Sequence, residues 1–301
     1  MRTIVGITGT TSVGKSEVAV KLAQLMGSEV VSADSMQIYK GMDIGTAKIT
    51  REQMQGVAHH MIDIVEPNCN YSSYLYQQDA SKIIDNMKRT PIVVGGTGFY
   101  FDSLLYPPEF GNVSEVRRNE LKELLNDEGL DALRHLLKQL DPDTYAQIDI
   151  NNPKRVLRAI EIAENGEKLA HGVGKIDPKY NLLLFVLQRD RNALYQQIDS
   201  RVDKMLDQGL VEEVKTLVEK YGNCDTSAFS AIGYKEVIDY LNGNCTLEDA
   251  IAQIKINTRH YAKRQITYFK KMTVTQYITV DDKSTNDIAK LIYDTVSARI
   301  I

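Results

Sequence analysis

The first hundred residues alternate between short apolar runs rich in β-branched residues and longer stretches with helical spacing of apolar positions. This alternation predicts a parallel β-sheet covered by helices. The expected strands are 3–8, 29–32, 61–65 and 91–94, and the expected helices are 15–26, 71–87 and one that contains 100–105.

A break in this alternation falls at residues 107–112, where two prolines and a glycine follow the last of these helices. Clusters of proline and glycine are typical of boundaries between structural units. From residue 114 to about 168 the chain shows only helical patterns, and Asn152 is the expected N-cap of a helix with Pro153 in its first turn. We therefore predict a helical insertion.

The apolar run at residues 182–187 predicts a return to the sheet, and residues 273–280 predict a last strand before a closing helix capped near Ser284. The fold class expected is α/β, with a parallel sheet, covering helices and a helical insertion domain. Its expected segments are the first part of the core at 1–111, the insertion at 112–180, and the completion of the core at 181–301.

Composition places the chain among globular proteins, with 301 residues, 43% of them apolar. Its apolar runs fall far short of the roughly 20 residues of a membrane span, and the N-terminal run lacks the length of a secretory signal. The three cysteines are far apart and fit no zinc spacing, which favours reduced thiols in the cytoplasm. A net charge of -4 excludes nucleic-acid coating by global charge, so an RNA site requires a local basic patch. A monomer is the default expectation.

The segment Gly9–Ser16 fits the P-loop pattern GxxxxGK[ST] and lies between an expected strand and an expected helix, as that pattern requires. In such a loop consecutive backbone N–H groups surround phosphate oxygens, and the helix N-terminus adds its dipole. Lys15 supplies a cation, and Ser16 can hold Mg²⁺. The residues expected to bind a diphosphate or triphosphate are Gly9, Thr11, Ser12, Val13, Gly14, Lys15 and Ser16. Because the loop recognises only negative charge and oxygen atoms, it does not indicate which phosphate compound binds.

Two further segments follow strands that should end at the same sheet edge. In the first, Asp34 could serve as a general base, a helix cap or a magnesium ligand, and Gln37 has the donor and acceptor of a base-reading amide. The second, Gly95–Gly98, could bring backbone and the Thr97 hydroxyl to a ligand, or could be a packing turn. A terminal Walker B aspartate and a guanine-specific NKxD motif are absent, which disfavours GTP switching and ATP hydrolysis.

Cationic side chains are concentrated in a helix predicted from a capping box at Thr246 to about residue 272. Six Lys or Arg and no acid occur from 254 to 271, and Lys255, Arg259 and Lys263 step by four along one face. This face is either solvated or binds RNA. The insertion adds Arg117, Arg118, Lys154, Arg155 and Arg158. Arg201 flanks the core face of another helix, and its pattern alone indicates a solvated arginine.

Nine motifs in order are similar to those of one family. They are the P-loop, Asp34–Tyr39, Gly45–Lys48, His59–Asp63, Gly95–Tyr100, Arg155 with Arg158–Glu161, Met205–Leu206 with Gly209–Leu210, Ile232–Glu236, and Thr258–Arg259 with Ala262–Gln265. Over almost its whole length the chain resembles the tRNA dimethylallyltransferases, also called tRNA isopentenyltransferases. The zinc finger of eukaryotic members is absent, so the bacterial form is expected.

The resemblance implies a P-loop NTPase-like fold whose P-loop holds the diphosphate of dimethylallyl diphosphate with Mg²⁺ as cofactor, held by Ser16 through the diphosphate. It implies the anticodon stem-loop of tRNA as partner, with prenylation at N6 of the adenosine just 3′ of the anticodon. Asp34 is then the general base, and Thr97 and Arg201 meet the leaving diphosphate. The implied tRNA contacts are Asp34, Ser35, Met36, Gln37, Thr97, Arg117, Lys154, Arg155, Arg158, Arg259 and Lys263.

Three positions depart from the family pattern, with Thr10 in place of a usual proline, Asn152 in place of a common aspartate and Tyr268 in place of a common tryptophan. The P-loop alone also permits a small-molecule kinase. A transferase acting on free adenine nucleotides and a non-catalytic RNA-binding module are further alternatives, although a mononucleotide needs neither the insertion nor the basic helix.

Overall fold

The computed structural model describes residues 1–106, 115–165, 177–222 and 224–300. The chain divides into two compact units, one formed by Met1–Pro107 with Pro178–Ile301 and the other by Pro108–Asp177. The break predicted at 107–112 lies outside the described residues, and so does the end of the predicted helical stretch beyond 165. Tyr180, expected as the last residue of the insertion, belongs to a strand of the first unit.

The first unit is built on a sheet in which every strand pairing is parallel. The order is β3-β2-β4-β1-β5-β6, which confirms the predicted α/β class. The strands are β1 (Arg2–Gly9), β2 (Val30–Ser32), β3 (His59–His60), β4 (Ile92–Val94), β5 (Tyr180–Gln188) and β6 (Gln276–Thr279). The chain thus returns to the sheet at β5, beside β1, as the apolar run at 182–187 predicts.

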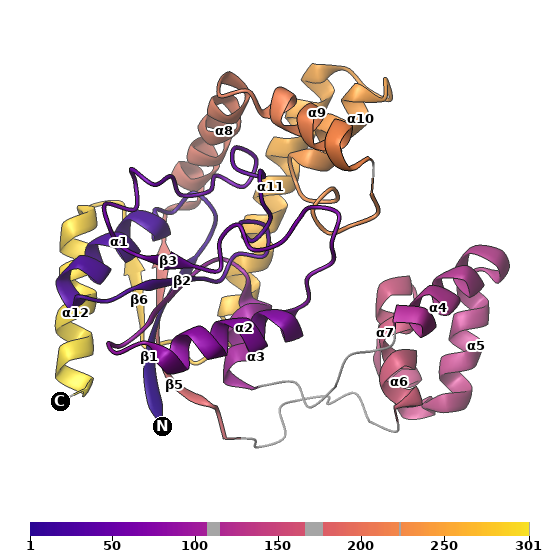
Figure 1. Ribbon diagram of the computed structural model, residues 1–301, viewed down its shortest axis with the longest axis horizontal. Helices are drawn as coiled ribbons and strands as arrows, with labels where there is room; N and C mark the ends of the chain where they lie inside the picture. Colours follow the sequence, from indigo (N-terminus) through magenta and orange to yellow (C-terminus); the bar gives the residue numbers. More distant parts are fainter. Residues whose placement is uncertain (107–114, 166–176, 223, 301) are drawn as a thin grey trace. The chain divides into compact units, whose positions relative to one another are not determined.

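Helices cover both faces of this sheet (Figure 1). Alternate residues of β1 face opposite sides, so Val5 packs in one core with α1 and α12, whereas Ile4 packs in another with α2 and α3. The helices of the first unit are α1 (Lys15–Met26), α2 (Ser73–Asn86), α3 (Gly98–Leu105), α8 (Arg191–Asp207), α9 (Leu210–Tyr221), α10 (Tyr234–Leu241), α11 (Leu247–Phe269) and α12 (Thr285–Ile300). A third core joins α8, α9 and α10 to residues 38–42.

The strand predicted at 61–65 is wrong. The backbone is left-handed at Met61 (φ 62°) and at Asp63 (φ 55°), which ends β3 after His60. The apolar run is instead fixed by an ion pair, because the buried ammonium of Lys48 lies 2.5 Å from an Asp63 carboxylate oxygen. The strand predicted at 273–280 is confirmed in a shorter form, as β6.

The second unit has its own apolar core. Its described helices are α4 (Glu115–Glu128), α5 (Leu130–Leu140), α6 (Pro142–Gln147) and α7 (Pro153–Glu164). Leu121, Leu133 and Ile160 are fully buried between α4, α5 and α7. The side chain of Asn152 accepts the backbone N–H of Arg155 at 3.3 Å, which confirms the predicted cap. Among the described helices of both units, none has the length and hydropathy of a membrane span.

Candidate active site

Three functional loops meet because β2, β4 and β1 are neighbours that run in the same direction. Beyond the paired strands, the Ala33 N–H donates to Val94 O at 2.7 Å, and the Thr97 N–H donates to Ala33 O at 3.1 Å. These bonds place the loop that begins at Asp34 directly against the glycine turn after β4. The two loops and the P-loop line a cavity of about 1250 Å³.

The P-loop has the backbone of a phosphate cradle. Gly9 has φ 144°, and a Cβ at this position would lie 2.3 Å from Leu187 O, so only glycine fits. Positive φ values at Ser12 (63°) and Gly14 (91°) turn the chain into α1. The Ser12 hydroxyl is buried and has no hydrogen-bond partner among the described residues, which suits a polar ligand here.

Lys15 is the cation of this cradle. Its Nζ donates to the carbonyls of Thr10 at 2.7 Å and Gly9 at 3.2 Å. Burial lowers the pKa of Lys15 to about 8, although nearby Asp34 favours the charged form; Arg201 lowers the pKa further. The cleft therefore holds an ammonium that is short of compensating negative charge.

Arg201 comes from α8 and is not a solvated arginine, so the interpretation from its helical pattern alone is wrong. Its guanidinium donates to Thr11 Oγ1 at 3.3 Å and to Thr46 O at 3.4 Å. Burial lowers the pKa of Arg201, and Asp34 opposes this effect. The second cation of the cavity thus lies against the P-loop.

Asp34 has one carboxylate oxygen occupied and one open. Oδ1 accepts the backbone N–H groups of Met36 at 2.9 Å and Gln37 at 3.4 Å. Residues 35–38 form a turn and not a helix, so Asp34 caps a turn, and the helix cap left open by the sequence is wrong. Within the described part of the chain, Oδ2 accepts no hydrogen bond. Thr97 Oγ1 accepts the N–H of Ser35 at 3.1 Å and donates to the Ser35 hydroxyl at 3.3 Å, so it lies against the residue that follows Asp34. Asp34 therefore combines a fixed orientation with a free acceptor.

Tyr261 and Gln265 of α11 belong to this site, although the sequence pattern assigned them no role. Burial, together with nearby Asp34, raises the pKa of the Tyr261 hydroxyl, and its neighbours Thr97 and Gln265 oppose this effect. Gln265 Oε1 accepts the Thr11 N–H at 2.8 Å, and Nε2 donates to Gly96 O at 3.0 Å. A Cβ on Gly96 would lie 2.1 Å from Nε2, so the glycine turn is partly a packing turn. The only signal in the sequence was that Gln265 ends the ninth motif and Tyr261 lies between its two parts.

Glu213 of α9 was also missed. Its carboxylate accepts the backbone N–H groups of Asp43 at 3.0 Å, Ile44 at 2.7 Å and Gly45 at 3.1 Å, and the Tyr234 hydroxyl at 2.6 Å. The segment 43–48 lines the same cavity as the P-loop. A Cβ on Gly45 would lie 2.5 Å from the Tyr234 ring. Glu213 and Tyr234 therefore fix one wall of the site.

The basic face predicted on α11 is largely neutralised in its first half. Lys255 lies 2.5 Å from Asp203, and Arg259 forms an ion pair with Asp199, both acids being on α8. Because the acids that pair with Lys255 and Arg259 come from another helix, the spacing of residues along α11 does not show them. Lys263, the third member, is exposed and forms no ion pair with the described residues.

The predicted basic residues of the insertion fall into two groups. Arg117 donates to Glu164 at 3.0 Å, and Arg158 donates at 3.0 Å to Glu161, whose side chain is fully buried. Lys154 and Arg155 are exposed, and Arg155 makes only a loose contact of 3.8 Å with Asp149. Lys154 and Arg155 are thus the more accessible cations for a nucleic acid.

Fold and site together define a P-loop α/β protein whose anion cradle faces a carboxylate. A family model described as IPP transferase matches residues 37–272, and one described as isopentenyl transferase matches residues 2–66. The chain is 42% identical to a tRNA dimethylallyltransferase of Clostridioides difficile, over 96% of this chain and 97% of that protein. The chain therefore belongs to the tRNA dimethylallyltransferase family.

Solved structures agree with this assignment. The full-length tRNA isopentenylpyrophosphate transferase of Bacillus halodurans has a TM-score of 0.76 at 39% identity, covering 100% of this chain and 97% of that one. A eukaryotic dimethylallyltransferase, described in its crystallographic study as acting on tRNA, has a TM-score of 0.81 at 29% identity, covering 100% of this chain and 78% of that one. These similarities confirm the P-loop NTPase-like fold and the class of prenyltransferases, and they favour this class over the kinase alternative.

The lowered pKa of Lys15 makes anion binding depend on pH. Free Lys15 loses its proton as the pH rises through about 8, whereas a bound diphosphate favours the protonated form. We expect the association constant of inorganic pyrophosphate to fall by up to about tenfold per pH unit above that value. Calorimetric titrations at several pH values would measure it, with Lys15→Arg as the control that keeps its charge and corrects for titration of pyrophosphate. Parallel profiles for the two proteins would contradict the assignment.

Gln265→Leu should destabilise the protein, because it leaves the half-buried Thr11 N–H and the buried Gly96 carbonyl without this partner. Each unsatisfied group costs about 1–3 kcal/mol, so the free energy of unfolding should fall by about 2 kcal/mol or more. Urea denaturation measures this loss. Gln253→Leu, on the exposed face of the same helix, serves as the matched control. Equal midpoints for the two variants would show that the bridge contributes no stability.

Proposed function

We propose that this protein transfers the dimethylallyl group of dimethylallyl diphosphate to N6 of the adenosine just 3′ of the anticodon in tRNA. The single observation that supports this most is the open Asp34 oxygen in the same cavity as Lys15 and Arg201. Two poorly solvated cations suit a leaving diphosphate, and a free carboxylate suits an incoming amine. The relatives named above supply the substrate classes.

Adenine N6 is a weak nucleophile because its lone pair is delocalised into the ring. Asp34 Oδ2 accepts the N6 proton as the new C–N bond forms, while the backbone bonds to Oδ1 keep the carboxylate in place. Tyr261 lines the cavity near Asp34 and borders the path of the incoming base, and Thr97 fixes the neighbouring Ser35 N–H. The target base leaves the RNA stack to reach this cavity, which costs a few kcal/mol.

The leaving diphosphate is stabilised by the P-loop. Lys15, the N-terminus of α1 and Arg201 supply positive charge where the bridging oxygen gains negative charge. The Ser12 hydroxyl, which has no partner among the described residues, supplies a donor. Mg²⁺, held by the Ser16 hydroxyl and by phosphate oxygens, would neutralise further charge on the diphosphate when bound.

Incubation with labelled dimethylallyl diphosphate tests the proposal. Label should enter tRNA, and it should not enter AMP or ATP when either is offered alone. Label in a free nucleotide would identify a transferase of mononucleotides. Consumption of ATP, with no label transferred to RNA, would identify a kinase and overturn the proposal.

Asp34→Asn separates the two roles of the carboxylate. The amide oxygen still accepts the N–H groups of Met36 and Gln37, but the side chain no longer takes a proton. We expect kcat to fall by at least about 10²-fold, while the affinity for pyrophosphate is kept or increases, because the change removes a negative charge near Lys15 and Arg201. Single-turnover kinetics with tRNA measure the rate. A near-normal rate would remove Asp34 as the base.

Charge reversal at Lys154 and Arg155 tests the insertion as a tRNA contact. Because both side chains are exposed, the double change to Glu should raise the KM for tRNA by about tenfold or more and leave the KM for dimethylallyl diphosphate unchanged. Arg158→Ala is a poorer probe, since it removes a partner of the buried Glu161 and is expected to destabilise α7. An unchanged KM for tRNA in the double variant would contradict the contact.

A further inference from the structure

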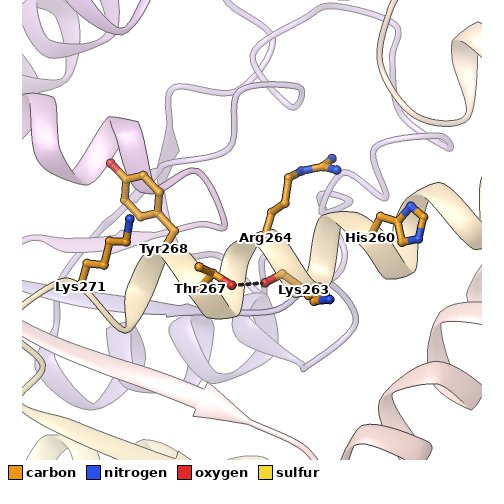
Figure 2. Close-up of a pocket in the computed structure, with 6 residues that line it drawn as sticks. All are labelled: His260, Lys263, Arg264, Thr267, Tyr268 and Lys271. Atoms are coloured by element: carbon orange, nitrogen blue, oxygen red, sulfur yellow. Dashed lines mark hydrogen bonds between the residues drawn. The ribbon is translucent and has the colours of Figure 1, made fainter. Parts of the chain in front are cut away.

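A second depression, of about 400 Å³, lies on the C-terminal half of α11 (Figure 2). We call it the α11 surface, and it is lined by His260, Lys263, Arg264, Thr267, Tyr268 and Lys271. Lys263, on α11, and Lys271, two residues beyond its end, are exposed and form no ion pair with the described residues, in contrast to Lys255 and Arg259 earlier on α11. The uncompensated positive charge of α11 is therefore gathered at this end.

Two aromatic rings border the same surface. The Phe99 ring is 68% exposed and lies edge-on to the Tyr268 ring, with centroids 5.2 Å apart. Tyr268 cannot move freely, because its hydroxyl donates to Asp102 and its ring packs onto Gly98, where a Cβ would lie 2.1 Å from it. An exposed ring beside a fixed ring and free cations is an arrangement suited to stacking of single-stranded bases with phosphate contacts.

The α11 surface is joined to the reaction cavity. Arg264 lines both depressions. Phe99 follows Thr97 by two residues, so the exposed ring lies at the start of α3, just outside the glycine turn. An RNA chain whose base enters the reaction cavity must continue across the surface that adjoins the cavity. We therefore identify the occupant of the α11 surface as the RNA that carries the reacting base.

We propose that the α11 surface binds the unpaired nucleotide adjacent to the acceptor adenosine. The exposed Phe99 ring stacks on its base while Tyr268 holds Phe99 edge-on, and Lys263 and Lys271 contact the flanking phosphates. This inference rests on the proposed function and adds the place where the neighbouring nucleotide is held.

Steady-state kinetics with an anticodon stem-loop RNA test the proposal. Phe99→Ala should raise the KM for RNA about tenfold, whereas Phe99→Tyr, which keeps the ring, should not. Lys263→Glu with Lys271→Glu should also raise this KM and should lower the salt dependence of binding by about one unit of log–log slope for each phosphate that the protein no longer binds. The KM for dimethylallyl diphosphate should stay constant. Tyr293→Ala and Lys290→Glu, exposed residues of the same kinds on α12, are matched controls.

A fluorescent base gives a direct readout of stacking. With 2-aminopurine next to the acceptor adenosine, binding to the wild type should quench its fluorescence relative to binding by Phe99→Ala. If the wild-type protein transfers the prenyl group but these variants retain its KM and its quenching, the α11 surface is not the binding site. If the wild type transfers nothing to RNA, the proposed function fails first.

Discussion

The site depends on one buried side-chain amide. Gln265 of α11 joins the P-loop to the glycine turn after β4 by accepting from Thr11 and donating to Gly96. A buried amide with both ends satisfied fixes two loops at once, because loss of either partner leaves a polar group without solvent or hydrogen bond. The close fit of Gly96 against the amide excludes any larger residue there. The helix that holds the phosphate loop thereby also positions Tyr261, beside Thr97, and the α11 surface.

The parallel sheet determines which loops meet at the site that Gln265 holds together. Because β2, β4 and β1 are adjacent, the segments that follow them need no long connections to face one ligand. The segment 43–48, which forms a further wall of the cavity, is held differently, because it does not follow a strand of the sheet. The Glu213 carboxylate takes the place of a strand by accepting three consecutive backbone N–H groups. Substitutions at Glu213 should therefore act through the position of this wall, with no direct role for the carboxylate in the chemistry.

The features that the sequence predicted well are those encoded locally. The periodicity at 3–8 and 15–26 and the P-loop between them depend on neighbouring residues, and the structure confirms the strand and the helix. The strand at 61–65 failed because its apolar pattern is overridden by the ion pair of Lys48 with Asp63, residues whose proximity no local pattern shows. The ion pairs of Lys255 and Arg259 with acids of α8 could not be predicted either, because no local pattern shows that the two helices are close. Gln265 contacts a loop near the other end of the chain, so its role required the sheet order and the packing of α11.

The charges of the cavity explain why its ligand should be a multiply charged anion. Burial lowers the pKa of both Lys15 and Arg201, which means that each cation is held at a cost in the free protein. The carboxylate that acts on both cations, Asp34, offsets only part of that cost. A diphosphate offsets more of it than a neutral or singly charged group could, and it raises the pKa of Lys15 on binding. The free-energy cost of holding two cations in a poorly solvated cleft is thus recovered only when the leaving group is bound. The same burial therefore disfavours the empty cavity and stabilises the state in which negative charge develops on the diphosphate.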